Sequence, residues 1–481
     1  MRDEPEGTPF RRLRALARNV TLYGFALFAP RVVRLITLPL ITFAVSLRVY
    51  GTYALLSLMI PFVHTLCELG MGTAALRLSP EADATTRRAL FSTVFASRMV
   101  LSGLATLVLF LARAKVARLL TGDASNAPMV TMVAATVWAM TLFDAFADQL
   151  RAEERHRLLA GLLVMRTLAV NGLAAFLVVV AHWGLTGLIA GRLIADVAMF
   201  VTIAWICRGT LRVRPTLIHF VALARLGAPM AMLYLLTNLR ELDRLMVKWR
   251  GSVEDVGTYD LAMRIVGPVA LANLALSLVL EPHVYRHFQS PRARETIEHF
   301  FRGYVVVFSI VAATVAVMSP EIFSLIAPES YGGAARAAPV LIFGFVADGV
   351  LRVAGIGADL AKRTGLWAIA ALVQVVVSLS IGFALIPTLG IVGAGAGFLV
   401  GSLVAAVLSH ALARKLFALT LPVARAVLVI VVGAALATLV LGLAPRAPST
   451  LVVRLIALSC FSLFAVVLTR FELGKVRGLL R

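Results

Sequence analysis

The sequence predicts an all-α polytopic membrane protein with about 14 transmembrane helices. We expect two six-helix lobes in parallel repeat around a central cavity, plus two extra helices. Composition is the first reason: 60% of the 481 residues are hydrophobic and 15% are charged, whereas soluble domains are about 45–50% apolar and about 25% charged. A series of long apolar runs and an internal repeat are the second and third reasons. This composition excludes an ordinary soluble enzyme.

Apolar runs of 18 or more residues, bounded by charged residues or by Gly and Pro turns, predict the spans. Because a spanning helix needs about 20 mostly apolar residues, such a set would occupy about 280 residues and leave about 200 for ends and loops. The predicted spans are residues 20–44, 49–76, 89–112, 127–150, 158–181, 184–207, 226–247, 256–280, 300–326, 337–360, 366–387, 390–410, 424–443 and 450–469.

The basic residues predict the orientation of these spans. If the N-terminus is cytoplasmic, most Lys and Arg residues fall in cytoplasmic segments and few fall in outside loops, as the positive-inside rule requires. We therefore expect a multi-pass protein with both termini in the cytoplasm. This topology accounts for much of the net charge of +21, so no nucleic-acid partner is expected.

The loops between the predicted spans are short, which leaves no room for an extramembrane catalytic domain or a nucleotide-binding cassette. The sequence contains no phosphate-binding loop, no dinucleotide fingerprint and no zinc-protease motif. Cys67, Cys207 and Cys460 lie far apart and form neither a disulfide framework nor a metal-ligand spacing. We expect a protein that is not an enzyme and that holds no metal or cofactor.

An internal duplication relates the two predicted lobes. The tripeptide Gly51-Thr52-Tyr53 recurs as Gly257-Thr258-Tyr259, an offset of 206 residues (257 minus 51). The same offset relates Gly184, Gly187 and Gly191 to Gly390, Gly393 and Gly397, and Arg34 to Arg240. A repeat of six spans is even, so both copies have the same orientation in the membrane and can rock about a midplane site.

The duplication and the span pattern predict five segments. These are a basic cytoplasmic N-terminal segment (1–19), an N-lobe (20–207), a cytoplasmic inter-lobe linker (208–225), a C-lobe (226–410), and a last segment (411–481) with spans 13 and 14 and a basic cytoplasmic tail.

Every basic residue within the predicted spans is an arginine. A charged side chain in the membrane is costly and should face protein or a water-filled cavity. Four groups can neutralise themselves at helical spacing. They are Arg192 with Asp196, Asp260 with Arg264, Asp348 with Arg352, and the run Arg240-Glu241-x-Asp243-Arg244.

Four other arginines have no acid three or four residues away in their own helix: Arg31, Arg34, Arg98 and Arg166. A planar guanidinium donates two parallel hydrogen bonds to phosphate and keeps its charge. These arginines therefore predict a pyrophosphate-binding site in the first lobe. In the alternative, Glu68 in span 2 or Asp144 and Asp148 in span 4 pair with them across helices.

Carboxylates in the spans are candidates for ion coupling, with a cation or a proton. The sequence does not choose among five aspartates, Asp144, Asp148, Asp260, Asp348 and Asp359, of which we retain Asp144, Asp148 and Asp348 as the candidates. His64 in span 2 is a candidate proton carrier, and the alternative is a histidine that serves helix packing.

Four segments resemble the bacterial polysaccharide-export flippases (O-antigen type) of the multidrug/oligosaccharidyl-lipid/polysaccharide exporter superfamily. They are Val49-Tyr50-Gly51-Thr52-Tyr53-Ala54-Leu55-Leu56, Leu69-Gly70-Met71-Gly72-Thr73-Ala74-Ala75-Leu76-Arg77, Asp243-Arg244-Leu245-Met246-Val247 and Val256-Gly257-Thr258-Tyr259-Asp260-Leu261-Ala262. The resemblance covers spans 1–12.

The resemblance implies a transporter in the bacterial cytoplasmic (inner) membrane. It would move an undecaprenyl-pyrophosphate-linked glycan from the inner to the outer leaflet by alternating access, for surface polysaccharides such as lipopolysaccharide. The coupling would be to Na⁺, H⁺ or the membrane potential, without a cofactor. Membrane lipids, a polysaccharide polymerase and glycosyltransferases are the expected partners besides the lipid-linked oligosaccharide.

The resemblance also implies a secondary contribution to the cavity, mostly from the second lobe. Its expected residues are Arg192, Asn238, Arg240, Asp243, Arg244, Asp260 and Arg264, with Asn238 and Asp260 facing sugar hydroxyls. Two related functions stay open, a lipid II flippase and a cation-coupled multidrug exporter. The surplus of arginine argues against the exporter, because organic cations need acidic or aromatic cavities.

Overall fold

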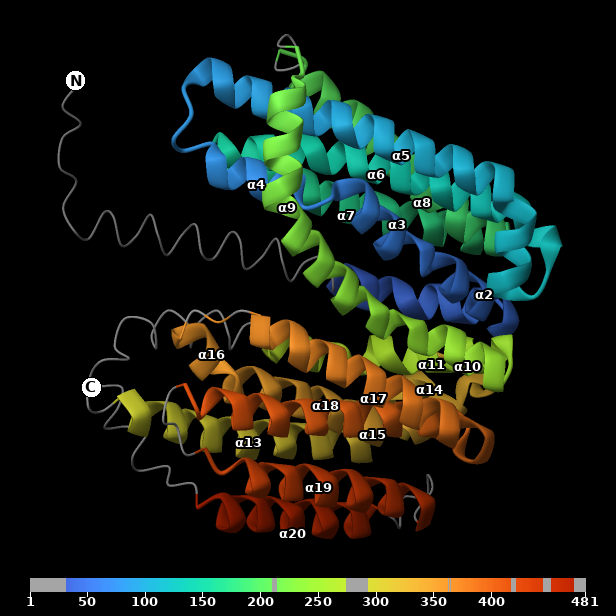
Figure 1. Cartoon of the computed structure of the whole chain (residues 1–481). Helices are drawn as coiled ribbons and strands as arrows, with labels where there is room; N and C mark the ends of the chain where they lie inside the picture. The colour runs from blue at the N-terminus through green and yellow to red at the C-terminus, as the bar shows by residue number, and fades with distance from the viewer. Residues whose placement is uncertain are drawn as a thin grey trace. The chain divides into compact units, whose positions relative to one another are not determined.

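A computed structural model describes residues 32–209, 214–273, 293–361, 363, 365–416, 421–443 and 451–470. Throughout these residues the regular secondary structure is helical (Figure 1). Twelve of the described helices are long and apolar enough to cross a membrane. The chain divides into two units, Met1–Asn238 and Leu239–Arg481. The all-α membrane fold predicted from composition is confirmed.

The twelve candidate spans correspond one by one to twelve of the fourteen predicted spans. Of the predicted span 20–44, the described part is the shorter apolar helix Val32–Ala44. Of the predicted span 256–280, the described part ends at residue 273. The basic terminal segments 1–19 and 471–481 lie outside the described residues.

The first unit contains the helix Val32–Ala44 and the elements that follow it. They are α2 (Leu47–Ser57), α3 (Met59–Glu68), α4 (Met71–Leu78), α5 (Ala84–Thr121), η1 (Ala124–Asn126), α6 (Ala127–Ala152), α7 (His156–Val179), α8 (Gly184–Ile206) and α9 (Leu217–Asn238). Helix α6 packs against α5, α8 and α3, and most of its apolar window is buried. It is therefore the central helix of this unit.

Helix α9 differs from the prediction in two respects. It begins at Leu217, inside the segment 208–225 predicted as a linker. It also packs on α3, α4 and α5, so the first helix predicted for the C-lobe belongs to the first unit. The cause is a packing contact: the sequence periodicity marks where a helix lies along the chain, whereas its neighbours depend on side-chain fit.

Helix α5 is 38 residues long. At 1.5 Å per residue it extends about 57 Å, far more than the hydrocarbon core of about 30 Å. Its start is fixed by Asp83, whose side chain accepts hydrogen bonds from the backbone N–H groups of Thr85 and Thr86. Its end is fixed by Gly122 at φ +81°, a conformation that suits glycine.

The second predicted span is broken between α3 and α4. Leu69 (φ 48°) and Gly70 (φ 65°) are both left-handed, which ends one helix and begins the next at an angle. Helix α9 crosses at this break. A Cβ added to Gly70 would stand 2.3 Å from the carbonyl oxygen of Gly227, so the two backbones touch directly.

The second unit contains the remaining elements. They are η3 (Leu239–Leu242), α10 (Asp243–Arg250), α11 (Val253–Val266), α13 (Ala293–Val317), α14 (Ser319–Ile326), η4 (Glu329–Tyr331), α15 (Gly333–Ala354), α16 (Ile356–Leu360), α17 (Gly365–Leu389), α18 (Ile391–Ala413), α19 (Val423–Leu443) and α20 (Leu451–Thr469).

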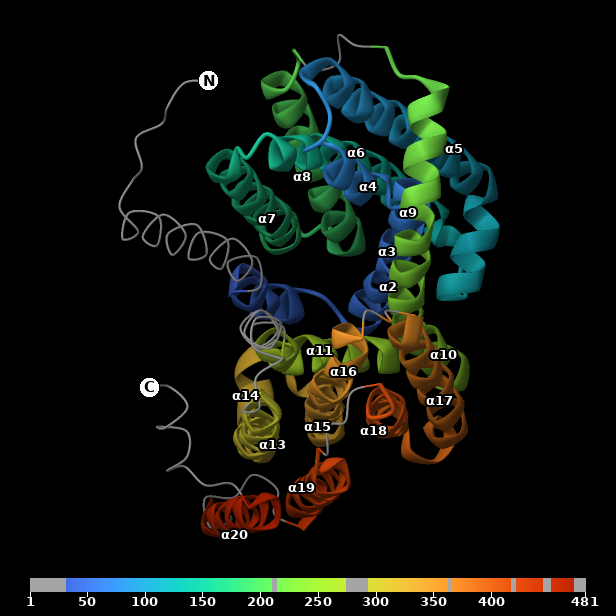
Figure 2. The ribbon, with the colours of Figure 1, turned by 60° about the vertical axis from the view of Figure 1, so that its left-hand side comes forward.

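Helix α15 is the central helix of the second unit. Figure 2 shows it between α13 and α18, with α17 next to α18, and the contacts agree. In the candidate span that contains α15, 94% of the apolar window is buried. Glycines on α18 permit this close packing: a Cβ on Gly397 would stand 2.4 Å from the carbonyl oxygen of Ser378 on α17.

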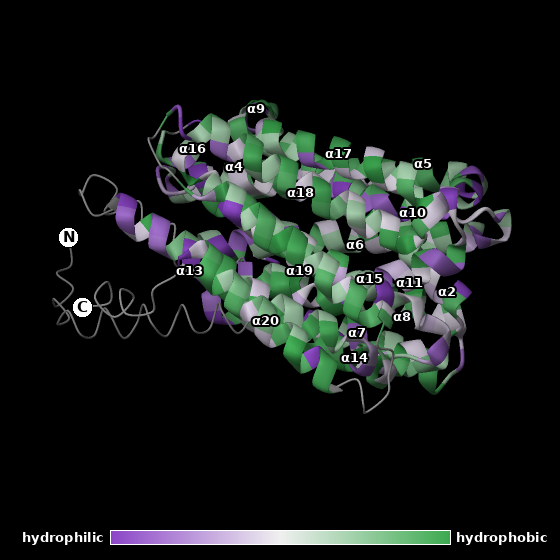
Figure 3. Cartoon of the chain, turned by 90° about the horizontal axis from the view of Figure 1, so that it is seen from below, coloured by the Kyte–Doolittle hydropathy of each residue, from purple (hydrophilic) through white to green (hydrophobic). Residues whose placement is uncertain are grey.

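Helices α19 and α20 pack against each other and against α13. Hydrophobic residues cover most of their visible surface (Figure 3). Gly433 on α19 lies against the rings of Phe343 and Phe461. Surfaces of this kind face lipid, as expected for the last two predicted spans.

Candidate substrate-binding site

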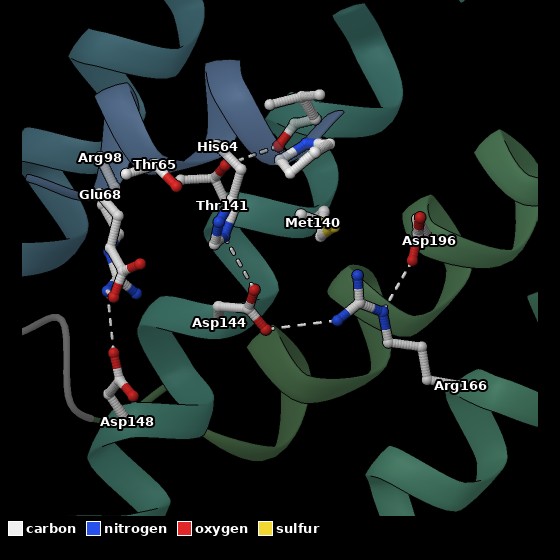
Figure 4. A network of polar contacts seen from close by, with 12 residues as sticks. His64, Thr65, Glu68, Arg98, Met140, Thr141, Asp144, Asp148, Arg166 and Asp196 are labelled. Atoms are coloured by element: carbon white, nitrogen blue, oxygen red, sulfur yellow. Dashed lines mark hydrogen bonds and ion pairs between the residues drawn. The ribbon is translucent and has the colours of Figure 1, made fainter. Parts of the chain in front are cut away.

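The four arginines predicted to bind pyrophosphate have different positions. Arg31 lies outside the described residues. Arg34 is exposed on the helix Val32–Ala44. Arg98 on α5 and Arg166 on α7 both enter ion-paired clusters of the first unit (Figure 4).

Arg98 is completely buried, with 0% of its surface exposed. Its Nη2 donates to Glu68 Oε1 at 3.0 Å and to Asp148 Oδ2 at 2.9 Å. The other carboxylate oxygen of Asp148 accepts from Arg151 Nη1 at 2.7 Å. These four residues form what we call the Arg98 cluster. It joins α3, α5 and α6.

Gly72 on α4 makes room for the Arg98 cluster. A Cβ at this position would stand 1.9 Å from Asp148 Oδ2 and 2.5 Å from Arg98 Nη2. Nε and Nη1 of Arg98 have no hydrogen-bond partner among the protein atoms of the described residues. The cluster is thus packed closely on one side and retains free donors on the other.

Arg166 joins two carboxylates from neighbouring helices. Its Nε donates to Asp196 Oδ1 on α8 at 2.7 Å, and its Nη1 donates to Asp144 Oδ1 on α6 at 3.3 Å. Its guanidinium also lies over the Phe143 ring, 4.7 Å from the ring centroid. The stronger of the two ion pairs is therefore the one with Asp196.

Each of the two carboxylates that pair with Arg166 has a second partner. His64 Nε2 on α3 lies 3.0 Å from Asp144 Oδ2, and Arg192 Nε lies 3.6 Å from Asp196 Oδ2. We call His64, Asp144, Arg166, Arg192 and Asp196 the Arg166 cluster. It connects α3, α6, α7 and α8 across the unit (Figure 4).

The cross-helix pairing that the sequence left open is therefore present. Each cluster contains two carboxylates and two guanidinium groups, so each is balanced when His64 is neutral. A surplus of positive charge at Arg98 and Arg166 does not occur among these contacts. The sequence could not show this because both arginines find their acids at least 22 residues away.

The carboxylates predicted for ion coupling are all engaged. Both oxygens of Asp144 and both of Asp148 contact cationic side chains or His64. A sodium ion at either position would have to displace an arginine or the histidine. Among the described residues, no group of three or more His, Cys, Asp or Glu side chains is arranged to hold a metal ion.

In the second unit Arg244 is the centre of an acidic group. Its Nε donates to Asp260 Oδ1 at 2.7 Å, and it also pairs with Glu241 and Asp243. Asp260 in turn accepts from Arg264 Nε at 2.5 Å. The predicted pair of Asp260 with Arg264 is confirmed. Of the run Arg240-Glu241-x-Asp243-Arg244, the contacts of Arg244 are confirmed, whereas Arg240 pairs with Asp348. With three acids and two arginines, this group is one negative charge in excess.

The group around Asp348 has a net charge of the opposite sign. Arg240 Nη1 lies 3.2 Å from Oδ1, and Arg352 Nε lies 3.9 Å from Oδ2. Gln374 Nε2 also donates to Oδ1, at 3.1 Å, and to Ser402 Oγ at 2.9 Å. The group is one positive charge in excess. Gln374 and Ser402 were missed from the sequence, although an amide within an apolar span is a usable signal.

Asn238, which the sequence predicts to contribute to the secondary cavity and to face sugar hydroxyls, contacts α3 of the first unit. Its Nδ2 donates to the Pro61 carbonyl at 3.0 Å and to Thr65 Oγ1 at 2.9 Å, both on α3 of the first unit. Its side-chain amide therefore connects the end of α9 to α3 through two hydrogen bonds.

A family model described as "Polysaccharide biosynthesis protein" matches residues 44–336. The chain belongs to this family. The match covers more than half of the chain and includes both first-unit clusters and the acidic group around Arg244. The resemblance to polysaccharide flippases seen in the sequence is thereby confirmed. No curated protein matches the chain by sequence.

Solved structures give the same fold at low sequence identity. The lipid II flippase MurJ in an inward closed conformation has a TM-score of 0.76 at 14% identity, over 96% of this chain and 100% of that chain. An inward-facing multidrug resistance MATE family transporter of the MOP superfamily has a TM-score of 0.65 at 13% identity, over 83% of this chain and 98% of that chain. A mutant of the Vibrio cholerae MATE transporter VcmN has a TM-score of 0.58 at 16% identity, over 84% of this chain and 97% of that chain.

The chain thus belongs to a polysaccharide biosynthesis family, has a fold similar to those of the MurJ flippase and of MATE transporters, and contains twelve candidate membrane spans among its described residues.

Proposed function

We propose that the protein flips an undecaprenyl-pyrophosphate-linked oligosaccharide from the inner to the outer leaflet of the bacterial cytoplasmic membrane by alternating access. The observation that carries the proposal is the family match over residues 44–336 in a chain whose membrane helices hold guanidinium groups in ion-paired clusters. The proposal makes the protein a transporter rather than an enzyme. An ion gradient or the membrane potential supplies the driving force.

The pyrophosphate is assigned to arginines whose side chains reach solvent. Arg166 and Arg192 are 15% and 27% exposed in the first unit, and Arg240 is 30% exposed in the second. Carboxylate partners hold the guanidinium groups of these arginines in place before the substrate binds. This lowers the side-chain entropy that is lost on binding. Arg98 has no exposed surface, so its assigned role is to position the helices around the site. Arg34 and Arg31 at the start of the first span stay in the assignment.

Within the second unit, Arg240 and Arg352 together exceed the charge of Asp348. Arg244 and Arg264 are surrounded by acids, and carboxylates of that group, including Asp243 and Asp260, suit hydrogen bonds from sugar hydroxyls. Organic cations are poor substrates in this proposal, because Asp144, Asp148 and Asp196 already pair with arginines.

The test is a thermal-shift titration on the full chain in lipid nanodiscs with three probes: an undecaprenyl-pyrophosphate oligosaccharide, lipid II and an organic cation. The variant is Arg166→Lys, which keeps the positive charge but loses the planar guanidinium group that donates two parallel hydrogen bonds. We expect the oligosaccharide lipid to stabilise the wild type and its Kd to rise about tenfold to a hundredfold in the variant, as for the loss of one charge-assisted hydrogen bond.

The matched control is Arg454→Lys on α20. Arg454 is buried and, like Arg166, pairs with a carboxylate, that of Glu321, but no site residue is assigned to its helix. It should leave the Kd unchanged. Preferential stabilisation by lipid II would instead assign the peptidoglycan precursor, and stabilisation by the cation alone would overturn the flippase proposal.

A further inference from the structure

His64 is the one imidazole in the Arg166 cluster, and imidazole is the side chain that proteins use most often to bind and release a proton. Its Nε2 lies 3.0 Å from Asp144 Oδ2, and the two side chains are 17% and 29% exposed. Neither side chain is completely enclosed by the protein. Figure 4 shows the imidazole directed at the carboxylate from α3, across from α6.

The charge of the cluster depends on this imidazole. Asp144 and Asp196 balance Arg166 and Arg192, so the cluster has no net charge when His64 is neutral and gains one positive charge when His64 is protonated. A balanced cluster has little attraction for an anion. A cluster with one extra positive charge attracts a phosphate group.

The distances indicate how the proton would act on Arg166. Asp144 Oδ1 is 3.3 Å from Arg166 Nη1, whereas Asp196 Oδ1 is only 2.7 Å from Arg166 Nε. Protonation of His64 adds the attraction between an imidazolium and a carboxylate to the existing contact with Asp144. Asp144 is then neutralised by His64, and the outer nitrogens of Arg166 become available to an anion while Nε stays anchored on Asp196.

Other charged groups near α3 belong to this balance. Glu68 lies one turn along the same helix, and Arg98 on α5 pairs with it. Helices α2 and α9 also pack against α3. Their ionisable residues are Arg48, Tyr50 and Tyr53 on α2, and His219, Arg225 and Tyr234 on α9. Because Glu68 is already paired with Arg98, Asp144 is the carboxylate that responds to His64.

We propose that His64 is a proton-binding residue whose protonation is linked to binding of the substrate phosphate at the Arg166 cluster. The inference rests on the proposed function. By linkage, anion binding increases the proton occupancy of His64, and protonation of His64 increases the affinity for the anion by the same factor. Binding therefore takes up as much as one proton.

The test is calorimetric titration of the full chain in nanodiscs with undecaprenyl pyrophosphate, in buffers of different ionisation enthalpy, between pH 6 and 8.5. The wild type should take up a fraction of one proton per lipid bound. Its Kd should rise with pH, by at most about tenfold per pH unit for one linked proton. His64→Gln, which keeps a donor for Asp144 and cannot titrate, should show no proton uptake and a flat Kd.

Two further variants separate a proton site from a packing role. Asp144→Asn gives the cluster one positive charge without a proton on His64, so its Kd at pH 8.5 should be lower than that of the wild type. His219→Gln is the matched control, because His219 also lies in the first unit and bonds to Thr216 Oγ1 at 2.8 Å. It should keep the proton uptake of the wild type.

The outcomes are distinguishable. If His64→Gln shifts the Kd equally at every pH and keeps the proton uptake, the histidine only packs and the inference is overturned while the flippase proposal stands. A wild-type Kd that does not change with pH overturns the inference in the same way. Absence of binding to undecaprenyl pyrophosphate in wild type and variants at every pH overturns both.

Discussion

The carbonyl oxygen of Gly227 lies 2.3 Å from the position that a Cβ on Gly70 would occupy. This contact joins α9 to the break between α3 and α4, and Gly70 is left-handed there at φ +65°. Both the space and the backbone conformation require glycine at residue 70, whereas at residue 227 the requirement is space alone.

The first prediction concerns this contact. Gly227→Ala should lower the free energy of unfolding by about 1–3 kcal/mol, because the added methyl overpacks a backbone contact. The measurement is thermal unfolding in nanodiscs. Gly172→Ala on α7, where a Cβ meets nothing within 4 Å, should be neutral or slightly stabilising. Equal stability of the two variants would contradict the prediction, because it would show that α9 can shift away from Gly70 to accommodate the added methyl group.

The second prediction separates positioning from binding. Arg98→Met should destabilise the protein by about 3–5 kcal/mol, since it leaves Glu68 and Asp148 without their buried partner. Adding Asp148→Asn should recover part of the loss. The readout is chemical or thermal unfolding together with the Kd for the lipid-linked oligosaccharide. A large change in Kd at unchanged stability would instead make Arg98 a direct ligand.

The third prediction follows from the placement of Asn238. Asn238→Ala removes hydrogen bonds to Pro61 and Thr65 and should cost about 1–2 kcal/mol of stability. Its effect on the Kd for the glycan-bearing lipid, relative to undecaprenyl pyrophosphate alone, should be nil. A selective loss for the glycan-bearing lipid would restore this residue to the sugar site.

The fourth prediction is a pH dependence at the start of α5. Hydrogen bonds from Thr86 and Thr85 lower the pKa of Asp83 from its ordinary value of 3.8. Because the folded pKa is below the unfolded pKa, the cap is fully stabilising above the unfolded value and is lost as the pH falls through the folded value. Hydrogen exchange of the first turn of α5 should therefore accelerate at acid pH. Asp83→Asn should remove this pH dependence.

The sequence predicted the helices well, because a membrane forces long apolar segments to be helical. Contacts within one helix were also predictable: Arg192 with Asp196 follows from spacing alone. Contacts between helices were predictable only in part: Glu68, Asp144 and Asp148 were named as alternative partners of the arginines, but the sequence did not assign each acid to its arginine. Arg166 and Asp196 are 30 residues apart, and only the packing of α7 on α8 brings them together. The break at Leu69 escaped prediction because a left-handed leucine has no sequence signature.

The Arg98 cluster also constrains the order in which the protein is made. Glu68 is synthesised 30 residues before Arg98, and Asp148 follows 50 residues after it. An unpaired arginine in a membrane helix costs about 2.5–3.5 kcal/mol on insertion scales. When α5 leaves the translocon, one partner is already present in α3 and the second arrives only with α6. The two carboxylate partners of Arg98 therefore become available at different times during synthesis, Glu68 before α5 and Asp148 only after α6 has been made.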